Sequence, residues 1–157
     1  MKIEAKLDFK SYLRLIAYLT VKRPITIIIM TFVVLFFLIG FIGQGFPFMG
    51  LGFIVFWVLF YVFSIYFGAK KNYYSNKRLD ERMEYEFSDE KIIIKGETFA
   101  LEMDWVKVYK VIELKSWVLI YQSAGAANII QKESFNGYLD EFREIVKSSG
   151  VKSKLKK

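Results

Sequence analysis

Residues 24–69 are the most hydrophobic part of the sequence, and this segment contains no charged side chain. Within it, residues 24–43 and 51–68 each come close to the length that an α-helix needs to cross a bilayer core. The residues that link them, 44–50, are rich in Gly and include Pro47, which favours a turn over one continuous helix. The pattern therefore predicts a transmembrane helical hairpin with a short external loop at 44–50.

Basic residues lie on both outer sides of this hydrophobic segment. Lys22 and Arg23 precede it, Lys70 and Lys71 follow it, and the linking residues have no positive charge. Because cytoplasmic flanks of membrane helices carry an excess of Lys and Arg, both termini are predicted to be cytoplasmic in a multi-pass membrane protein.

The predicted hairpin has no ionisable side chain with which to form a transport pathway, and two helices cannot enclose a pore. We therefore expect it to act as an anchor for the rest of the chain.

A half-buried strand and a helix are predicted before the hairpin. Ile3, Ala5 and Leu7 alternate with charged residues, and Asp8 is a suitable N-cap for a helix that follows. This helix is expected either to lie at the membrane interface or to pack on the cytoplasmic domain. Its predicted apolar face consists of Phe9, Tyr12, Leu13, Ile16 and Leu19.

Short runs of alternating hydrophobic residues follow the hairpin and predict strands at MEYEFS, KIIIK, TFALEMDW, VKVYKVIEL, WVLIYQ and NIIQK. A helix is predicted over 137–150, with Gly150 as its stop. Its buried face is expected to be Leu139, Phe142, Ile145 and Val146.

With the strand before the hairpin, these runs give up to seven short strands and one C-terminal helix. This count resembles a pleckstrin-homology-like antiparallel barrel, and a generic antiparallel α+β sheet fits it nearly as well. The predicted order is a cytoplasmic N-terminal segment at 1–23, the transmembrane hairpin at 24–69, a cytoplasmic domain at 79–149 and a basic tail at 150–157.

The positive charge is unevenly distributed along the chain. The net charge is +7, although residues 79–146 contain 14 acidic and only 8 basic side chains. This distribution makes nucleic acid an unexpected partner and favours attraction of the basic segments to an anionic membrane surface. The tail is predicted either to contact anionic lipid or to be an ordinary disordered end. The candidate lipid-binding residues are Lys152, Lys154, Lys156 and Lys157.

The sequence contains no Cys and no His. Disulfides, thiolate nucleophiles, His-based triads and the usual zinc ligands are therefore excluded. The acidic cluster of Asp140, Glu141 and Glu144 is expected to be a solvated helix face near the N-terminal end of the helix dipole. We expect no enzymatic activity, no cofactor and no metal.

Two tryptophans and one acidic residue remain as candidates for a binding site. Trp105 and Trp117 are predicted to pack in the fold, with their N–H groups bonded to backbone, and not to stack on a ligand. Glu113 interrupts an apolar run, and two interpretations are possible. It could be a buried functional carboxylate, or it could be a structural residue that is exposed at a strand end or pairs with a lysine. The second interpretation is favoured, with Lys115 or Lys132 as the partner.

Several segments resemble the YcxB-like family of small bacterial membrane proteins. The similar segments are YEFSDEKIIIK, MDWVKVYKVIELKSWVLIY, NIIQKESF and EFREIVK. The resemblance implies a short strand and helix, two membrane crossings and a C-terminal cytoplasmic domain of pleckstrin-homology-like type, in the bacterial cell membrane. It implies neither catalytic residues nor a defined ligand. The family positions, which we interpret as structural, are Trp105, Glu113, Tyr121, Lys132 and Phe135.

One position departs from the family pattern. The family usually has Pro where this chain has Gln131, and a Pro there would end the strand. Gln131 predicts that the strand continues past this point.

The sequence thus predicts a membrane-anchored, non-enzymatic protein that presents a cytoplasmic interaction module. Its expected partners are the lipid bilayer at the inner leaflet, a membrane protein or a second copy of the chain. The alternative is an accessory subunit of a transporter, or a bacteriocin-immunity-type protein, that acts through its transmembrane hairpin.

Overall fold

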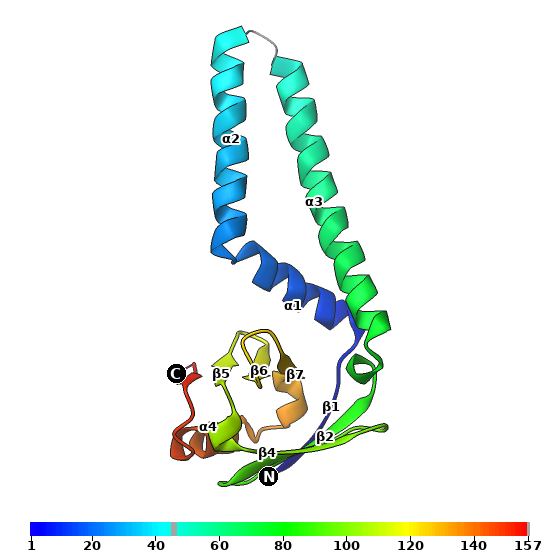
Figure 1. Cartoon of the computed structure of the whole chain (residues 1–157), viewed down its shortest axis with the longest axis vertical. Helices are drawn as coiled ribbons and strands as arrows, with labels where there is room; N and C mark the ends of the chain where they lie inside the picture. The colour runs from blue at the N-terminus through cyan, green and yellow to red at the C-terminus, as the bar shows by residue number, and fades with distance from the viewer. Residues whose placement is uncertain (45–46, 157) are drawn as a thin grey trace. The chain divides into compact units, whose positions relative to one another are not determined.

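A computed structural model describes residues 1–44 and 47–156 of the chain (Figure 1). The chain divides into two compact units. One is a helical unit, Asp8–Ser75, and the other is a sheet unit made of Met1–Leu7 and Asn76–Lys157. The sheet unit is therefore built from two segments that are separated in sequence by the whole helical unit.

The helical unit contains α1 (Phe9–Val21), α2 (Pro24–Gln44) and α3 (Pro47–Ser75). The predicted N-cap is confirmed, because the Asp8 side chain accepts a hydrogen bond from the Ser11 N–H at 3.0 Å. The Phe9 ring of α1 contacts Tyr66, Tyr73 and Tyr74 of α3, with centroids 5.5 to 5.9 Å apart. Aromatic contacts therefore join α1 to α3.

The buried face of α1 differs partly from the predicted one. Tyr12 is buried as predicted, and Leu15, which the predicted face did not include, is fully buried. Leu13 and Ile16 are only half-buried. The apolar positions of α1 form a broad stripe, so the sequence pattern alone did not determine which of them is most buried.

Helix α2, and α3 up to Ala69, contain no charged side chain. The segment Leu51–Ser75 of α3 is long and apolar enough to cross a membrane. The helices Phe9–Val21 and Pro24–Leu38 would pass the same test as a pair, but the chain bends by 66° between them. By length and composition, the described residues thus contain one candidate membrane span. There are two candidates if the bent pair is treated as a single span.

Helix α3 begins earlier and ends later than the predicted span at 51–68. It starts at Pro47, inside the predicted loop, and continues to Ser75. Proline is well tolerated at the first helical position because its missing N–H has no intrahelical partner there. The remaining part of the predicted loop, 45–46, lies outside the described residues.

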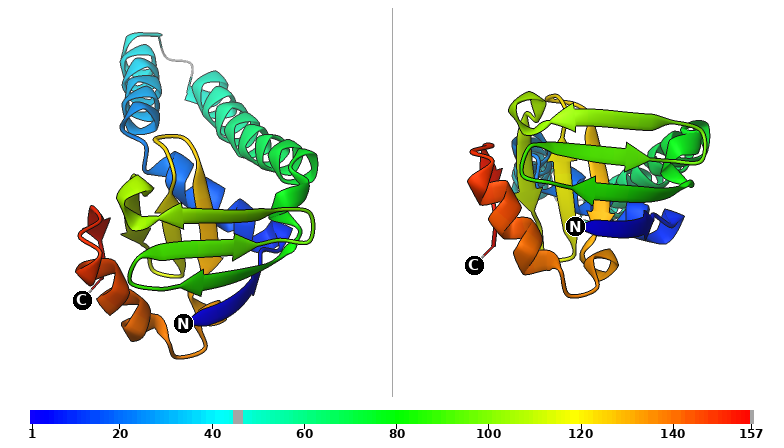
Figure 2. Two further views of the ribbon diagram at one scale, coloured as in Figure 1. Left: turned by 60° about the horizontal axis from the view of Figure 1, so that its bottom comes forward. Right: turned by 90° about the horizontal axis from the view of Figure 1, so that it is seen from below.

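The sheet unit consists of two four-stranded sheets. Sheet A has the order β1-β2-β3-β4 and is antiparallel, whereas sheet B has the order β7-β6-β5-β8, with β8 parallel to β5. Figure 2 shows the strands of sheet A running across those of sheet B. The strands are β1 (Lys2–Lys6), β2 (Arg82–Phe87), β3 (Lys91–Lys95), β4 (Ala100–Asp104), β5 (Lys110–Glu113), β6 (Trp117–Tyr121), β7 (Ala127–Gln131) and β8 (Ser153–Lys154).

The predicted strand before the helical unit is confirmed as β1. It pairs with β2, so that Ile3 lies opposite Tyr85. Ile3, Ala5 and Leu7 are all buried, as their alternation with charged residues predicted. The first residues of the chain are therefore a structural part of the sheet unit.

One hydrophobic core lies between the two sheets and helix α4 (Leu139–Ser148). Phe87 lies near its centre: the Phe142 ring of α4 meets it edge-on at 4.9 Å, and the rings of Phe135 and Trp105 lie 6.4 Å away. The predicted buried face of α4 is confirmed by the complete burial of Phe142 and Val146. Burial of such aromatic side chains is the main stabilising contribution to a domain of this size.

The predicted strand VKVYKVIEL is shorter in the structure. A single 3-10 turn, η2 (Trp105–Lys107), comes first, and β5 begins only at Lys110. Trp105 fixes this turn, because its backbone N–H donates to the Glu90 carbonyl at 3.2 Å and its indole N–H to the Ser88 carbonyl at 2.8 Å. The predicted packing role of Trp105 is confirmed by these bonds.

The strand was also predicted to continue past Gln131, and this is wrong. β7 ends at Gln131, and the 3-10 turn η3 (Lys132–Phe135) follows. The turn buries the Phe135 ring completely in the core. It ends at Asn136, whose φ of 48° lies in the left-handed region that Asn tolerates well. Burial of Phe135 therefore ends the strand even without a proline.

Residues 150–156 are ordered, in contrast to the disordered end that one of the two predictions allowed for the tail. Ser153 and Lys154 form β8, and the Val111 N–H donates to the Lys152 carbonyl at 2.9 Å. Val151 and Leu155 pack against the core as partly buried residues. The sequence predicted up to seven strands, and the tail adds an eighth strand within the described residues.

Candidate functional site

Glu113, the last residue of β5, is the most extensively bonded carboxylate in the sheet unit. It is only 4% exposed. Arg143 of α4 donates to it through Nε at 3.0 Å and Nη2 at 2.6 Å, and Lys132 of η3 forms an ion pair with it. The backbone N–H of Lys156 also donates to it, at 3.0 Å.

These contacts determine the charge of Glu113. Burial alone would raise its pKa, but the hydrogen bonds from Arg143, Lys132 and the Lys156 N–H outweigh burial and lower the pKa to about 2. Hydrogen bonds to Glu113 and to Asp140, whose Oδ1 lies 2.5 Å from Nη1, raise the pKa of Arg143. Both groups are therefore ionised near neutral pH, and Glu113 is poorly suited to general acid–base chemistry.

The Glu113 cluster, defined here as Glu113, Lys132, Arg143 and Lys156, joins four separate segments of the sheet unit. Glu113 was predicted to be exposed or to pair with a lysine; the second of these outcomes is confirmed by its pairing with Lys132, and the carboxylate is buried. The other proposed partner, Lys115, is exposed and makes no ion pair within the described part of the chain. Sequence reasoning missed Arg143, although it is the one basic residue in the acidic first two turns of α4.

A second feature is the edge of sheet B that β8 forms next to β5. Ser153 lies opposite Val111 and Lys154 opposite Ile112, so the pairing brings the tail lysines beside Lys110. We call Lys110, Lys152, Lys154 and Lys156 the basic edge.

The one acidic residue of β5 and β8, Glu113, is buried and pairs with Arg143 and Lys132, so it does not compensate the side-chain charges of the basic edge. Residues 105–112 and 145–157 together contain seven lysines and no acidic residue. Two of these lysines are paired with neighbouring acids, Lys107 with Asp104 at 2.9 Å and Lys147 with Glu144 at 2.7 Å. Lys152, Lys154 and Lys156 are exposed and have no ion pair among the described residues, so their charges face solvent uncompensated.

Exposed apolar side chains precede the basic edge in sequence. Val106 is 94% exposed and Tyr109 is 52% exposed. The Lys110 ammonium lies 5.2 Å from the Tyr109 ring centre and 4.7 Å from that of Tyr121. Cation–π contacts of this kind keep the aliphatic part of Lys110 against the rings.

The remaining predicted residues have structural or solvated positions. Phe135 is fully buried in the core, and Trp117 and Tyr121 are half-buried at the two ends of β6. The acidic residues of α4 are exposed, as expected for a solvated face. Lys157 lies outside the described residues, so its predicted contact with anionic lipid stays a prediction.

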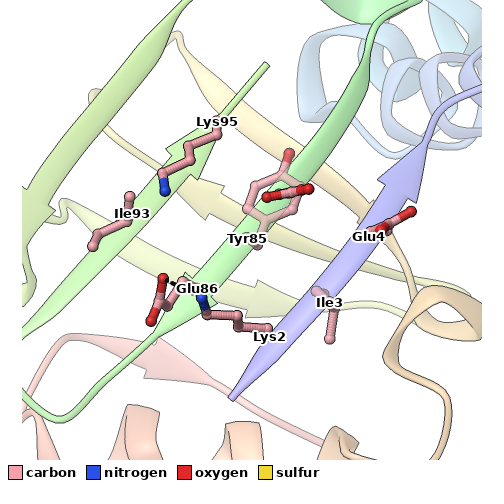
Figure 3. Close-up of a pocket in the computed structure, with 8 residues that line it drawn as sticks. Lys2, Ile3, Glu4, Tyr85, Glu86, Ile93 and Lys95 are labelled. Atoms are coloured by element: carbon pink, nitrogen blue, oxygen red, sulfur yellow. Dashed lines mark ion pairs between the residues drawn. The ribbon is translucent and has the colours of Figure 1, made fainter. Parts of the chain in front are cut away.

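A shallow depression of about 390 Å³ lies on the outer face of sheet A (Figure 3). Lys2 and Glu86 form an ion pair across it at 3.2 Å, and Ile93 and Lys95 of β3 line its other side. Acidic and basic side chains alternate on this face and pair across the strands, which is the usual composition of a solvated sheet surface.

The described residues contain no group of three or more Asp and Glu side chains placed to hold a metal ion.

The two units together describe an α+β protein that has one helix long and apolar enough to cross a membrane. A protein-family model described as YcxB-like protein matches residues 87–146. This match confirms the family resemblance predicted from the sequence, and it covers three members of the Glu113 cluster, namely Glu113, Lys132 and Arg143. No curated protein and no solved structure matches the chain.

Proposed function

We propose that this chain is a non-enzymatic, membrane-anchored protein of the bacterial cell membrane. Its sheet unit is a pleckstrin-homology-like module in the cytoplasm, and the basic edge of this module binds anionic lipid of the inner leaflet. The observation that carries the proposal is the pairing of β8 with β5, which gathers uncompensated lysines along one sheet edge.

Two features support the membrane anchor. Residues 24–69 have no charged side chain, and α2 and α3 expose large apolar residues along their described lengths. The basic flanks of the segment favour a hairpin whose two outer ends are cytoplasmic. In this topology both parts of the sheet unit, which precede and follow the hairpin, are on the same side of the membrane.

The strand order supports the pleckstrin-homology-like arrangement. Sheet A and sheet B share one core, and α4 packs against that core through Phe142 and Val146. Two crossed sheets with a C-terminal helix on their shared core are what such a module requires. Sheet B has β8 as an additional edge strand, and this strand carries Lys154.

Charge favours a lipid surface as the partner of the basic edge. A lysine close to an anionic membrane contributes about 1 kcal/mol of attraction. Four such residues would therefore hold the module weakly and reversibly, while the hairpin supplies permanent attachment. Tyr109 is an exposed side chain of the kind found at the level of the lipid headgroups, and Val106 is an exposed apolar side chain near it in sequence.

The buried carboxylates support a non-enzymatic role. Glu81 and Glu113 are the buried acidic residues of the described chain. Glu81 accepts hydrogen bonds from the Thr98 N–H and hydroxyl at 3.1 and 2.6 Å. Glu113 accepts hydrogen bonds from the other members of the Glu113 cluster. Glu113 therefore has no acceptor position left for a substrate, and Glu81 is held in place by both of its oxygens.

The proposal can be tested by measuring the lipids that copurify with the full-length protein in mild detergent. Lys152→Glu/Lys154→Glu should weaken the affinity for anionic lipid by roughly 30-fold or more, since two lysines contribute about 2 kcal/mol, and the share of anionic lipid that copurifies should fall. The matched control is Lys95→Glu/Lys115→Glu, which makes the same change in net charge at two exposed, unpaired lysines outside the edge. Equal losses in both variants would show that the basic edge has no special role.

A further inference from the structure

A pocket of about 370 Å³ opens between the two sheets, within the sheet unit. Its volume lies in the range of small-molecule binding sites. Residues from the end of β1, the start of β2, β4 and β7 line it, together with the segment 76–81. It is separate from the basic edge and from the Glu113 cluster, since none of their residues lines it.

The pocket walls have an apolar part and a polar part. Met83 and Tyr85 of β2, Leu101 of β4 and Ile129 of β7 belong to the apolar part. Phe99 also lines the pocket, and the Arg78 guanidinium lies over its ring, 4.5 Å from the ring centre. The pocket therefore combines apolar side chains with polar ones, among them the Arg78 guanidinium and the Glu81 carboxylate.

Two hydrogen-bond donors that line the pocket lack a good acceptor. The Asn128 Nδ2 atom is buried and has no hydrogen-bond partner among the described residues. The Tyr85 hydroxyl, in a side chain that is 2% exposed, donates to the Met83 sulfur at 3.2 Å. A thioether is a weak acceptor, so this bond satisfies the hydroxyl only in part.

Buried polar groups are nearly always hydrogen-bonded in folded proteins, so two poorly satisfied donors in one pocket require an explanation. Burial raises the pKa of Tyr85, so its hydroxyl remains a donor near neutral pH. The buried carboxylate that lines the same pocket, Glu81, is already bound by Thr98 and accepts from neither donor. The missing group is an acceptor oxygen.

We infer that this pocket binds a small amphipathic molecule that has an apolar body and a carbonyl or carboxylate oxygen. The apolar body lies against Met83, Leu101 and Ile129. The oxygen accepts hydrogen bonds from Asn128 Nδ2 and the Tyr85 hydroxyl. This site requires neither membrane binding by the basic edge nor any catalytic step.

The pocket supplies its own spectroscopic reporter. Met83 lines it, whereas Met103 is a buried core residue that does not, and both methyl groups are observable by NMR in full-length protein labelled with ¹³C-methyl methionine. The ligands to be titrated are three water-soluble probes of similar shape that differ in the head group. They are 4-phenylbutyrate, its neutral amide and 4-phenylbutylamine.

The carboxylate and the amide should shift the Met83 signal saturably, and the amine, which offers no acceptor oxygen, should not. A stronger effect of the carboxylate than of the amide would assign a role to Arg78. Asn128→Ala should weaken binding about tenfold, which is the usual effect of removing one hydrogen bond. Leu101→Trp, which fills the pocket, should abolish the shift while the Met103 signal shows that the core remains folded.

Three results would overturn the inference. One is the absence of a saturable Met83 shift with either acceptor probe, which would mean that the pocket holds only water. Another is an equal response to the amine, which would mean unspecific contact with an apolar surface. The third is a shift that survives Leu101→Trp in folded protein, which would place binding elsewhere.

Discussion

At the scale of single residues, Glu113 shows how one buried charge can order several segments. Its carboxylate is held by side chains from η3 and α4 and by the backbone of the tail. A buried ion pair contributes little net stability compared with apolar side chains of the same size, but removal of one partner leaves the others uncompensated. The cluster therefore links the tail to η3 and α4 through one side chain.

Glu113→Gln should lower the free energy of unfolding by about 3 kcal/mol or more, since Lys132 and Arg143 would keep their charges without a buried partner. The full-length protein in detergent can be unfolded with denaturant and followed by tryptophan fluorescence. Glu144→Gln, at an exposed position of α4, is the control and should change stability by less than about 0.5 kcal/mol.

The same variant should change the pH dependence of stability. The pKa of Glu113 is lowered from 4.5 to about 2 in the folded state. Its stabilising contribution is therefore complete above about pH 5 and is lost as the pH falls toward 2. The wild type should lose more stability over this interval than Glu113→Gln. Parallel losses in both proteins would show that the carboxylate is not held as the structure describes.

At the scale of elements, β8 is the least predictable part of the fold and the one on which the proposed function depends most. It has only two residues, lies at a sheet edge and pairs in parallel with β5, a pairing that is somewhat weaker per residue than an antiparallel one. Its attachment rests on the Val111–Lys152 hydrogen bond, on the Lys156 N–H and on Val151 and Leu155.

Truncation after Gly150 should free the β5 edge. The Val111 amide would lose its acceptor, so its hydrogen exchange should become faster by about tenfold or more. Lys152→Ala/Lys154→Ala keeps the backbone of β8 and should leave this amide protected. If Val111 is equally protected in the truncated protein, then β8 does not cover the edge.

The elements that the sequence predicted correctly are those whose pattern is local. The alternation of Ile3, Ala5 and Leu7 is sufficient for β1, and the spacing of Phe142 and Val146 is sufficient for α4. The Glu113 cluster was only partly predicted, because its partners are 19, 30 and 43 residues away in sequence. The tail strand and the pocket between the sheets likewise depend on contacts that no local pattern encodes.

At the scale of the whole molecule, one chain combines a charge-free helical segment with a sheet unit whose basic residues gather at one edge. The sheet unit includes β1, so one part of it precedes the helical unit in the sequence and the other part follows it. In the function proposed above, permanent attachment by the helices keeps the basic edge at a high local concentration near lipid. Even a weak interaction with anionic headgroups would then be populated.

The most direct test of this account measures where the basic edge lies relative to the bilayer. The chain contains no Cys, so Ser153→Cys provides a unique attachment site for an environment-sensitive fluorophore on β8. The labelled full-length protein is placed in nanodiscs of neutral lipid or of lipid that includes an anionic component. Lys152→Glu/Lys154→Glu and the control Lys95→Glu/Lys115→Glu are measured in the same way.

Membrane contact by the basic edge predicts blue-shifted emission in anionic discs only. The shift should weaken at high salt, because salt screens exposed charges, and it should be absent from Lys152→Glu/Lys154→Glu but present in the control. Identical emission in neutral and anionic discs, or the same response in both double variants, would contradict the claim that this edge binds anionic lipid.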